Sequence, residues 1–230
     1  METMWLRVRA PFAAFRGFQA GVYRATSPVM PPSTAYGLIL NLAGFEMRGP
    51  MTGVTTEIRD GLPRLRIAVG AISLPEMSTI YQQLHSYPVG ASGKELSART
   101  HGAKFWIIPV RREILVGYDG MIGVQADDSS LLECARKGLR GELDSPRYGL
   151  PFAGENNLLI DKIDVEHEPP ATRWYARMQL DDPPRQGSCR LTVGINRTDN
   201  SKTCSYLYAP TADASNRPPD GAWTWVPNEP

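Results

Sequence analysis

The first regular pattern in the chain is the segment Trp5–Arg9, where apolar and polar side chains alternate. Leu6 and Val8 fall on one face. Trp5, Arg7 and Arg9 fall on the other face. A period of two is typical of a strand that buries one face. We therefore predict a strand whose outer face carries one aromatic ring and two guanidinium groups.

A helix is predicted after two adjacent prolines. Ser33 follows Pro31 and Pro32 and can cap the helix, the apolar positions lie within residues 36–43, and Gly44 is a natural terminator. This order of strand, long loop and capped helix is typical of the start of an α+β fold.

Four further apolar segments predict strands. They are Leu65–Ile72, Thr79–Tyr87, Phe105–Val116 and, as the last core strand, Leu158–Val165. Pro109 indicates an edge or a bulge in the third of them, because proline cannot donate a ladder hydrogen bond. Between the second and the third, residues 88–104 combine three glycines with Lys94, Arg99, His101 and Lys104, which predicts a flexible basic hairpin that projects from the sheet.

The middle of the chain contains three regularly spaced glycines and a second helix signal. Gly117, Gly120 and Gly123 are spaced by three, which favours a twisted or bulged hairpin over a dinucleotide-binding motif. Ser129–Leu139 has capping side chains just before it and Gly141 just after it, so we predict a short helix there.

The last quarter of the chain is rich in paired prolines. Two strands are predicted within it, Arg190–Ile195 and Cys204–Tyr208. We therefore expect a domain over residues 1–168 and a proline-rich C-terminal extension over residues 169–230, made of one hairpin and a loose end. Trp223 and Trp225 are expected to dock on the rest of the protein, because two exposed indoles would lower solubility.

Composition restricts the class of protein. The 230 residues, 42% of them hydrophobic, can form one sizeable globular domain with or without an appendage. No apolar run approaches the length of a membrane span, and the first residues lack the basic and then apolar tract of a signal peptide, so a cytoplasmic protein is expected. Three widely spaced cysteines do not make a disulfide framework or a zinc cluster.

Charge is distributed unevenly along the chain. The formal net charge is +1, yet residues 1–115 contain 13 basic and 7 acidic side chains, whereas residues 116–230 contain 12 and 17. Such a split allows one face to bind a polyanion and another to face solvent or a basic partner. The alternative is chance clustering of solvated charges.

Known catalytic motifs are missing from the sequence. It has no metalloprotease helix motif, no Cys-x-x-Cys pair, no nucleophile elbow and no P-loop. The three histidines have no partners at helical spacing. The sequence therefore predicts neither a metal site nor a cofactor.

Two segments have the residue types of a nucleic-acid interface. In the first, arginines that can bind phosphates are interleaved with aromatic rings on which unstacked bases can lie. These residues are Arg7, Arg9, Arg16 and Arg24, with Trp5, Phe15, Phe18 and Tyr23. The alternative is a solvated sheet face with core aromatics.

The second segment is Ser145–Asn157. Gly149 and Gly154 let backbone amides approach a phosphate or base closely, while Arg147 and Tyr148 supply charge and a stacking surface. The alternative is an ordinary surface turn.

Several of these segments resemble one family. Residues 5–16, Met30–Leu38 and Ala43–Gly44 resemble the N-terminal signature of the Cas-five family, the CRISPR-associated subunit that caps the 5′ handle of the guide RNA (crRNA) in type I Cascade complexes. The THG of Thr100–Gly102, the PVRREIL of Pro109–Leu115 and the RYGLPFAGENN of residues 147–157 are similar to its DevS-like branch, the Myxococcus subtype. The tail after Glu168 matches no family pattern.

The resemblance implies a fold and a function. The fold is a RAMP fold of the α+β class, ferredoxin-like and related to the RRM, with a β-hairpin thumb around residues 79–116. The function is that of a non-catalytic subunit that binds and caps the crRNA 5′ handle. It contacts the large subunit and the Cas-seven backbone subunits, and it meets target DNA only indirectly, in antiviral defence or transposon targeting. By this analogy Arg7, Arg9, Arg16, Arg24, Arg147 and Tyr148 face the handle, and Lys94, Arg99, His101 and Lys104 belong to the thumb.

Two alternatives stay open. One branch of the family cuts precursor crRNA without a metal ion, and here Tyr81, His85, His101 and Lys104 could supply a base, an acid and a cation for such an endoribonuclease. The DevS-like branch leaves cutting to a separate enzyme, so binding is the expected function. An unrelated ligand-binding α+β protein is the other alternative, and the near-neutral total charge is compatible with it.

Overall fold

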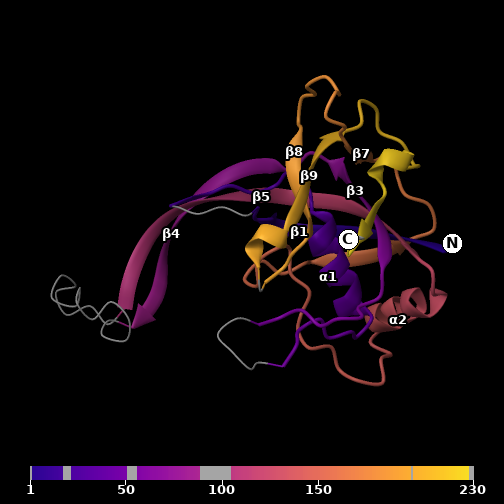
Figure 1. Cartoon of the computed structure of the whole chain (residues 1–230), viewed down its shortest axis with the longest axis horizontal. Coiled ribbons are helices and arrows are strands. Elements are labelled where there is room, and N and C mark those ends of the chain that lie inside the picture. Colours follow the sequence, from indigo (N-terminus) through magenta and orange to yellow (C-terminus); the bar gives the residue numbers. More distant parts are fainter. Residues whose placement is uncertain (1, 18–21, 51–55, 89–104, 198, 228–230) are drawn as a thin grey trace.

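A twisted, mostly antiparallel sheet forms the centre of the protein. The computed structural model describes residues 2–17, 22–50, 56–88, 105–197 and 199–227. Figure 1 shows the helices packed beside the sheet and a long hairpin that projects from it.

Within the described residues, the elements follow one another as ten strands, two α-helices and two short 3₁₀ helices. The strands are β1 (Glu2–Ala13), β2 (Tyr23–Arg24), β3 (Leu65–Ser73), β4 (Glu76–Pro88), β5 (Phe105–Ala126), β6 (Lys162–Glu166), β7 (Arg173–Arg177), β8 (Cys189–Gly194), β9 (Cys204–Pro210) and β10 (Thr224–Val226). The helices are α1 (Pro32–Leu42), α2 (Ser129–Arg140), η2 (Asn200–Lys202) and η3 (Asp220–Ala222).

The main path of the sheet has the order β6-β1-β5-β3-β7-β9-β8, while β10 pairs with β3, and β2 and β4 pair with β5. Strand β5 therefore lies between β1 and β3 and is antiparallel to both. The chain passes from β1 to β3 through α1 and from β5 to β6 through α2. The apolar side of this arrangement forms the main core, with fully buried side chains from β1, α1, β3, β5 and α2.

Strand β1 has the alternation predicted from its sequence. Leu6 and Val8 are fully buried and point toward the helices, which confirms the predicted inner face. Trp5, Arg7 and Arg9 are partly exposed on the other face. Strand β1 is longer than the alternating segment, because residues on both sides of it also pair with β5.

Helix α1 begins differently from the prediction. The residue at its N-cap is Pro31, with no side-chain hydrogen bond, so Ser33 is not the cap. The reason is that Pro32 occupies the first turn, where its fixed φ suits a helix and its missing N–H would have no partner anyway. The predicted end is confirmed, since Gly44 follows the helix with a φ of 78°.

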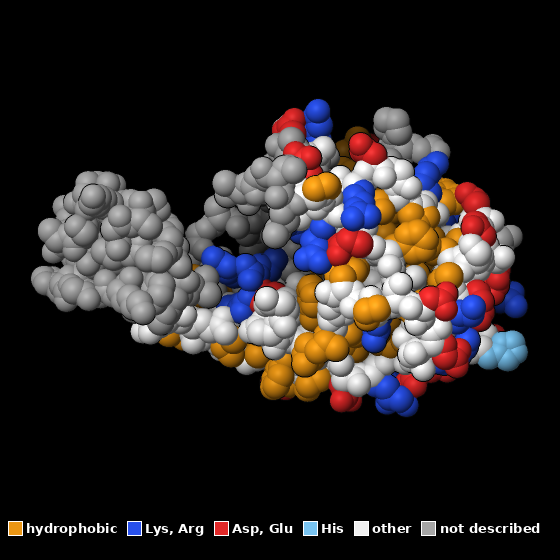
Figure 2. Space-filling model, turned by 90° about the horizontal axis from the view of Figure 1, so that it is seen from below, with side chains coloured by type: hydrophobic (Ala, Val, Ile, Leu, Met, Phe, Trp, Pro, Cys, Tyr) orange, Lys and Arg blue, Asp and Glu red, His pale blue; other side chains and the backbone are white. Residues whose placement is uncertain are grey.

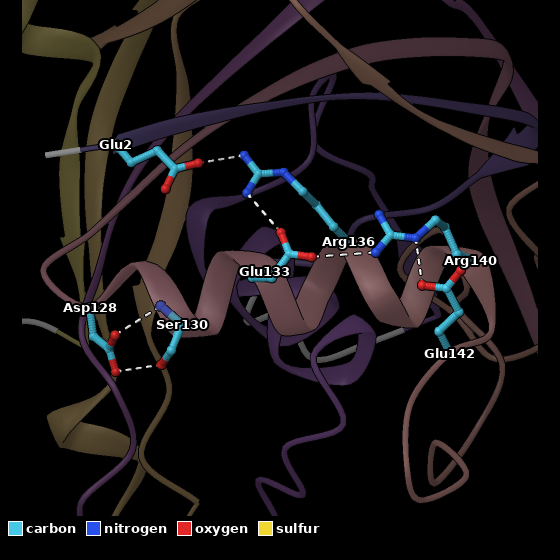
Figure 3. Close-up of polar contacts among 7 residues, drawn as sticks. All are labelled: Glu2, Asp128, Ser130, Glu133, Arg136, Arg140 and Glu142. Carbon is cyan, nitrogen blue, oxygen red and sulfur yellow. Dashed lines mark hydrogen bonds and ion pairs between the residues drawn. The ribbon is translucent and has the colours of Figure 1, made fainter.

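Helix α2 is confirmed together with both its caps. Asp128 accepts a hydrogen bond of 2.8 Å from the backbone N–H of Ser130, and Gly141 ends the helix with a φ of 74°. Exposed ion pairs cover its outer side (Figure 3), joining Arg136 to Glu2 and Glu133, and Arg140 to Glu133 and Glu142. Because exposed pairs add little stability, the buried side of α2 does most to hold it in place.

Helices α1 and α2 touch through a glycine. A Cβ at Gly138 would overlap the carbonyl oxygen of Leu42 at the end of α1. The two helices therefore approach more closely than any larger residue at position 138 would allow.

Strands β4 and β5 form the projecting hairpin (Figure 1). Their pairing runs without a register shift from Glu76 opposite Val116 to His85 opposite Ile107. The predicted strands Thr79–Tyr87 and Phe105–Val116 are confirmed within β4 and β5, whereas the basic hairpin predicted between them, with Lys94, Arg99, His101 and Lys104, lies outside the described residues. Pro109 sits opposite Gln83 in regular pairing.

The predicted hairpin at the three glycines is wrong. Gly117, Gly120 and Gly123 all lie inside β5, which continues from the projecting hairpin into the sheet as one strand. Gly117 has a φ of 68°, a backbone conformation that favours glycine, where β5 leaves β4 and continues between β1 and β3. Gly123 is needed for packing, since a Cβ there would overlap the ring of Trp5.

The predicted last core strand is also corrected. Strand β6 starts at Lys162 and lies at the end of the sheet, where it pairs with β1 on one side. Val165 is largely exposed. A single paired neighbour leaves the strand half-exposed, which the apolar residues 158–160 did not indicate.

The C-terminal residues join the same sheet. The two predicted strands are confirmed as β8 and β9, but the remainder is not a loose end, because β7 and β10 both pair with β3. Trp174 is fully buried, and its ring and that of Trp223 lie 5.8 Å and 5.9 Å from the ring of Trp5. Docking of Trp223 is thus confirmed, and Trp225 packs beneath the guanidinium of Arg64, 4.9 Å away.

Candidate nucleic-acid interface

Two arginines converge on one buried carboxylate where the projecting hairpin meets the body. Glu155, from the loop between α2 and β6, forms ion pairs with Arg112 of β5 and with Arg16, which follows β1. The side chains of Arg112 and Glu155 are each 6% exposed, whereas that of Arg16 is 40% exposed. Arg16 is therefore the member of this group that solvent, or a ligand, can reach.

Gly154 positions Glu155. Its φ is 88°, and a Cβ at this position would overlap the carbonyl oxygen of Ala14. The loop is fixed at the same point by a 3.0 Å hydrogen bond from the Ala14 N–H to the Ala153 carbonyl. A glycine is thus required for the loop to come close enough for Glu155 to reach both arginines.

Arg112 is also anchored to the other strand of the hairpin. Its Nη1 donates a 2.7 Å hydrogen bond to the side-chain oxygen of Gln82 on β4. Burial, together with the neighbouring charges of Arg16 and Arg24, lowers the pKa of Arg112 to about 10. The guanidinium therefore remains protonated at neutral pH, and the effect of Arg24 shows that a third arginine is close.

Strand β2 brings further groups to the same place. It pairs in parallel with β5, so that Tyr23 lies opposite Arg111 and Arg24 opposite Arg112. Glu113 accepts a 2.5 Å hydrogen bond from the Tyr23 hydroxyl and a 2.9 Å hydrogen bond from the Thr26 N–H. The bond to Glu113 raises the pKa of Tyr23.

We call this group the hairpin-base cluster. It consists of Arg16, Arg24, Arg111, Arg112, Glu113 and Glu155. Four guanidinium groups face two carboxylates, so the cluster carries an excess of positive charge. Figure 2 shows Lys and Arg side chains gathered where the hairpin leaves the body.

Two exposed tyrosine rings lie beside the cluster. Tyr23 of β2 and Tyr81 of β4 line a shallow depression together with Arg111, Thr79 and Ile80. Aromatic rings next to guanidinium groups are the combination that single-stranded nucleic acids require, since rings stack on bases while arginines bind phosphates.

Arg7 and Arg9 lie elsewhere, on the outer face of the sheet. Arg7 forms two hydrogen bonds with the Asp119 carboxylate, of 2.9 and 2.7 Å, and these raise its pKa. Arg9 donates a 2.7 Å hydrogen bond to Asp164. Both guanidinium groups are thus held by carboxylates of neighbouring strands.

The predicted aromatic platform is largely absent from that face. Trp5 is covered by Trp174 and Trp223, and Phe15 is buried in the core against Tyr118. Phe18 lies outside the described residues. Of the four aromatics proposed from the sequence, Tyr23 is the one that the structure shows exposed, because C-terminal tryptophans cover Trp5 and Phe15 packs into the main core.

Tyr148 lies in a separate groove, beside α1. The guanidinium of Arg48 stands 5.0 Å from the centre of its ring, and Arg147 precedes it in the loop. The sequence-based site therefore divides into Arg16 and Arg24 at the hairpin base, Arg7 and Arg9 on the outer face, and Tyr148 in the groove. For the alternative ribonuclease set, Tyr81 is exposed on β4 and the backbone of His85 pairs with Ile107, while His101 and Lys104 are outside the described residues.

Sequence reasoning missed Arg111, Arg112, Glu113 and Glu155. A signal for them was present, because two arginines and a glutamate interrupt the otherwise apolar segment Phe105–Val116. Charges in such a strand need partners when they are buried. The glycine-containing loop of residues 145–157 supplied the partner.

The described part of the chain offers neither a metal site nor a membrane helix. Within it, no three His, Cys, Asp or Glu side chains are grouped so that they could hold a metal ion. None of its helices has both the length and the apolar character that crossing a membrane would require.

Comparisons with known proteins point to one group. Residues 3–129, more than half of the chain, match the model of a family described as CRISPR-associated protein (Cas_Cas5). No curated protein matches the chain in sequence.

Two solved structures share its fold. One is a chain of a "CRISPR RNA-guided surveillance complex", with 11% identity and a TM-score of 0.62 over 93% of this chain and 90% of that chain. The other comes from "Crystal structure of Cas protein", with 12% identity and a TM-score of 0.52 over 94% of this chain and 96% of that chain.

Proposed function

The chain belongs to the Cas5 family of CRISPR-associated proteins, and we propose that it is a non-catalytic RNA-binding subunit of a type I Cascade complex. In this role it binds and caps the 5′ handle of crRNA, for RNA-guided DNA recognition in antiviral defence or transposon targeting. The hairpin-base cluster is the surface that we assign to the RNA.

The observation that carries the proposal is the composition of this surface. Arg16 is accessible while its partner Glu155 is buried, and two exposed tyrosine rings lie next to it. A phosphate can therefore approach the cluster from solvent, and an unstacked base can lie against Tyr23 or Tyr81. The positive excess favours a polyanion over a neutral ligand.

The fold supports the same role. We interpret the order β6-β1-β5-β3, with α1 and α2 as its connections, as a ferredoxin-like core of the RAMP type, and the β4–β5 hairpin as the thumb. Residues 88–104 would form its end, so Lys94, Arg99, His101 and Lys104 are assigned to the thumb. A similar fold occurs in a chain of an RNA-guided surveillance complex.

The proposed partners follow from this role. They are crRNA, the large subunit and the Cas-seven backbone subunits, with target DNA contacted indirectly. The net charge of +1 is low for a protein that binds RNA alone. A subunit whose neighbours add positive surface does not need a large excess of its own.

Charge reversal in the assembled complex tests the proposal. Arg16→Glu and Arg24→Glu are expected to reduce copurified crRNA, and the slope of log affinity against log salt should become shallower by about 0.7 for each phosphate that the variant no longer binds. Arg185→Glu, an exposed arginine of the C-terminal part, is the matched control. Unchanged RNA content and salt sensitivity in both cluster variants would show that this surface does not bind the RNA.

A separate experiment tests the proposal that the protein does not cut RNA. Purified protein incubated with repeat RNA and a chelator is expected to leave the RNA intact. Cleavage would show that the protein is a metal-independent endoribonuclease. Cleavage by His101→Ala as well would show that His101 is not essential for that activity.

A further inference from the structure

A second polar site lies in a groove beside α1. Its walls are one side of α1 from Ser33 to Asn41, residues 57–64, the loop that contains Tyr148, and the ends of β8 and β10. The groove has a cavity volume of about 880 Å³, which is within the usual range for sites that take small ligands. A nucleotide fits such a volume.

The rim of the groove is positively charged. The charged side chains that line it are Arg48, Arg59, Arg64 and Arg197, against Glu57 and Asp60. Arg48 is fixed by two hydrogen bonds to Glu46, of 2.9 and 2.8 Å, and Arg59 by a 2.7 Å hydrogen bond to the Arg48 carbonyl. With the Glu46 carboxylate that pairs with Arg48 included, four guanidinium groups face three carboxylates, and this small positive excess favours an anionic group of a ligand.

The wall formed by α1 contains a buried amide with an unused acceptor. Asn41 is 7% exposed, and its Nδ2 donates a 3.3 Å hydrogen bond to the carbonyl of Gly149. Its Oδ1 accepts no hydrogen bond from any described residue. A buried acceptor without a partner is unfavourable, so the site is arranged for a donor that the described residues do not provide.

Tyr148 lies between this amide and solvent. Burial raises the pKa of its hydroxyl, and hydrogen bonding to Asn41 opposes the shift, which places the two side chains next to each other. The tyrosine is 40% exposed, so it can turn outward and present its ring to a ligand. The groove thus combines cations, a stacking ring and an amide.

We propose that this groove binds one unstacked adenine nucleotide of single-stranded RNA, with its phosphate at the rim arginines, its base against Tyr148 and its exocyclic amino group donating to Oδ1 of Asn41. An asparagine amide pairs with adenine through two hydrogen bonds, from the amino group to Oδ1 and from Nδ2 to a ring nitrogen. Gly149 uses one hydrogen of Nδ2, and the other becomes available when Tyr148 turns outward. The inference rests on the proposed RNA-binding role and adds a base preference to it.

Short RNA oligonucleotides test the inference with the purified chain. The probes are a labelled uridine octamer and the same octamer with a single adenine at each position in turn, with binding followed by fluorescence anisotropy. We expect at least one adenine position to increase affinity about tenfold, since a good base contact contributes about 1–3 kcal/mol. Asn41→Leu should abolish this increase, so that the adenine-containing octamers bind no better than the uridine octamer does.

Two variants accompany Asn41→Leu. Asn156→Leu changes an exposed asparagine of the neighbouring loop and should keep the adenine preference. Tyr148→Leu removes the stacking ring at a partly exposed position, so it should fold and lose most of the increase even if Asn41→Leu does not fold. Equal binding of all octamers by the wild type, or an adenine preference that survives both groove variants, would overturn the inference.

The same experiment distinguishes failure of the inference about the groove from failure of the proposed function. Arg16→Glu should weaken all octamers by a similar factor, because that side chain binds phosphate and not base. Equal octamer affinities that all fall in Arg16→Glu would leave the RNA-binding role standing and remove the groove. No binding of any octamer by the wild type would contradict both.

Discussion

The guanidinium of Arg112 on β5 and the carboxylate of Glu155 in the loop before β6 form an ion pair that is almost completely shielded from water. The pair connects the projecting hairpin to the body, because Arg112 also binds Gln82 on β4. Removal of one partner leaves the other as a buried charge with fewer hydrogen bonds. The pair therefore fixes the geometry of the surface that we assign to RNA.

Glu155→Gln is expected to destabilise the protein strongly. Breaking a buried ion pair costs about 3–5 kcal/mol, so the free energy of unfolding in urea should fall by about 3 kcal/mol. Glu142→Gln breaks an exposed pair with Arg140 and should change it by less than about 1 kcal/mol. An equal fall in the free energy of unfolding in the two variants would show that burial of the pair does not determine its contribution to stability.

Gly154→Ala is expected to displace the loop that holds Glu155. The new side chain meets the Ala14 carbonyl in a left-handed backbone conformation, and we expect a loss of about 2 kcal/mol in unfolding free energy. Gly149→Ala is the matched control in the same loop, because nothing lies within 4 Å of an added Cβ there. A comparable loss in the control would contradict the close approach at Gly154.

Removal of the C-terminal strands is expected to prevent stable folding of the remainder. A chain that ends at Glu168 lacks β7 and β10 and uncovers Trp5, Ala68 and Met121, which pack against Trp174 and Trp223. It should bind a hydrophobic dye and lose cooperative thermal unfolding. A chain that ends at Pro227 retains all ten strands and should behave as the full chain does. Cooperative unfolding of the shorter chain would establish residues 1–168 as an independent domain.

The cap of α2 is expected to make stability depend on acid pH. Hydrogen bonds from Ser130 lower the pKa of Asp128 below its ordinary 3.8, so folding favours the charged carboxylate. Its contribution is complete above the ordinary value and is lost as the pH falls through the lowered one. The melting temperature of the wild type should therefore fall more than that of Asp128→Asn below about pH 4, since asparagine caps a helix without titrating. Parallel curves for the two proteins would exclude the effect.

Local patterns predicted most of the elements. Alternation at Trp5–Arg9, the capped segment before Gly141 and the two strands of the proline-rich tail were all found where they were expected. The family resemblance of residues 5–16, Met30–Leu38 and Ala43–Gly44 agrees with the family match over residues 3–129, whereas the loop of residues 147–157 lies outside the matched range. Each of these signals depends on neighbouring residues, and the sequence contains it directly.

The start of α1 and the length of β5 were less predictable. Ser33 and Pro32 both favour a helix start. The helix begins at Pro32, because backbone N–H groups of the first turn have no partner within the helix and proline lacks this group. The glycines of β5 predicted a hairpin, yet at two of them the missing side chain leaves room for the rings of Trp5 and Tyr118. The ring at Gly123 comes from another strand, β1, whereas the ring at Gly120 belongs to β5 itself, so only the first contact depends on a distant segment.

The sequence by itself determined β1, β3, β4, β8 and β9, the second helix with its caps, and the family. Only the tertiary structure decided which charges and rings are available for binding. Arg7 and Arg9 meet carboxylates of other strands, Trp5 is covered by tryptophans of the C-terminal part, and Arg16 stays accessible above Glu155. Alternation and capping are properties of neighbouring residues, whereas exposure and ion pairing depend on segments far apart in the chain that meet when the sheet closes.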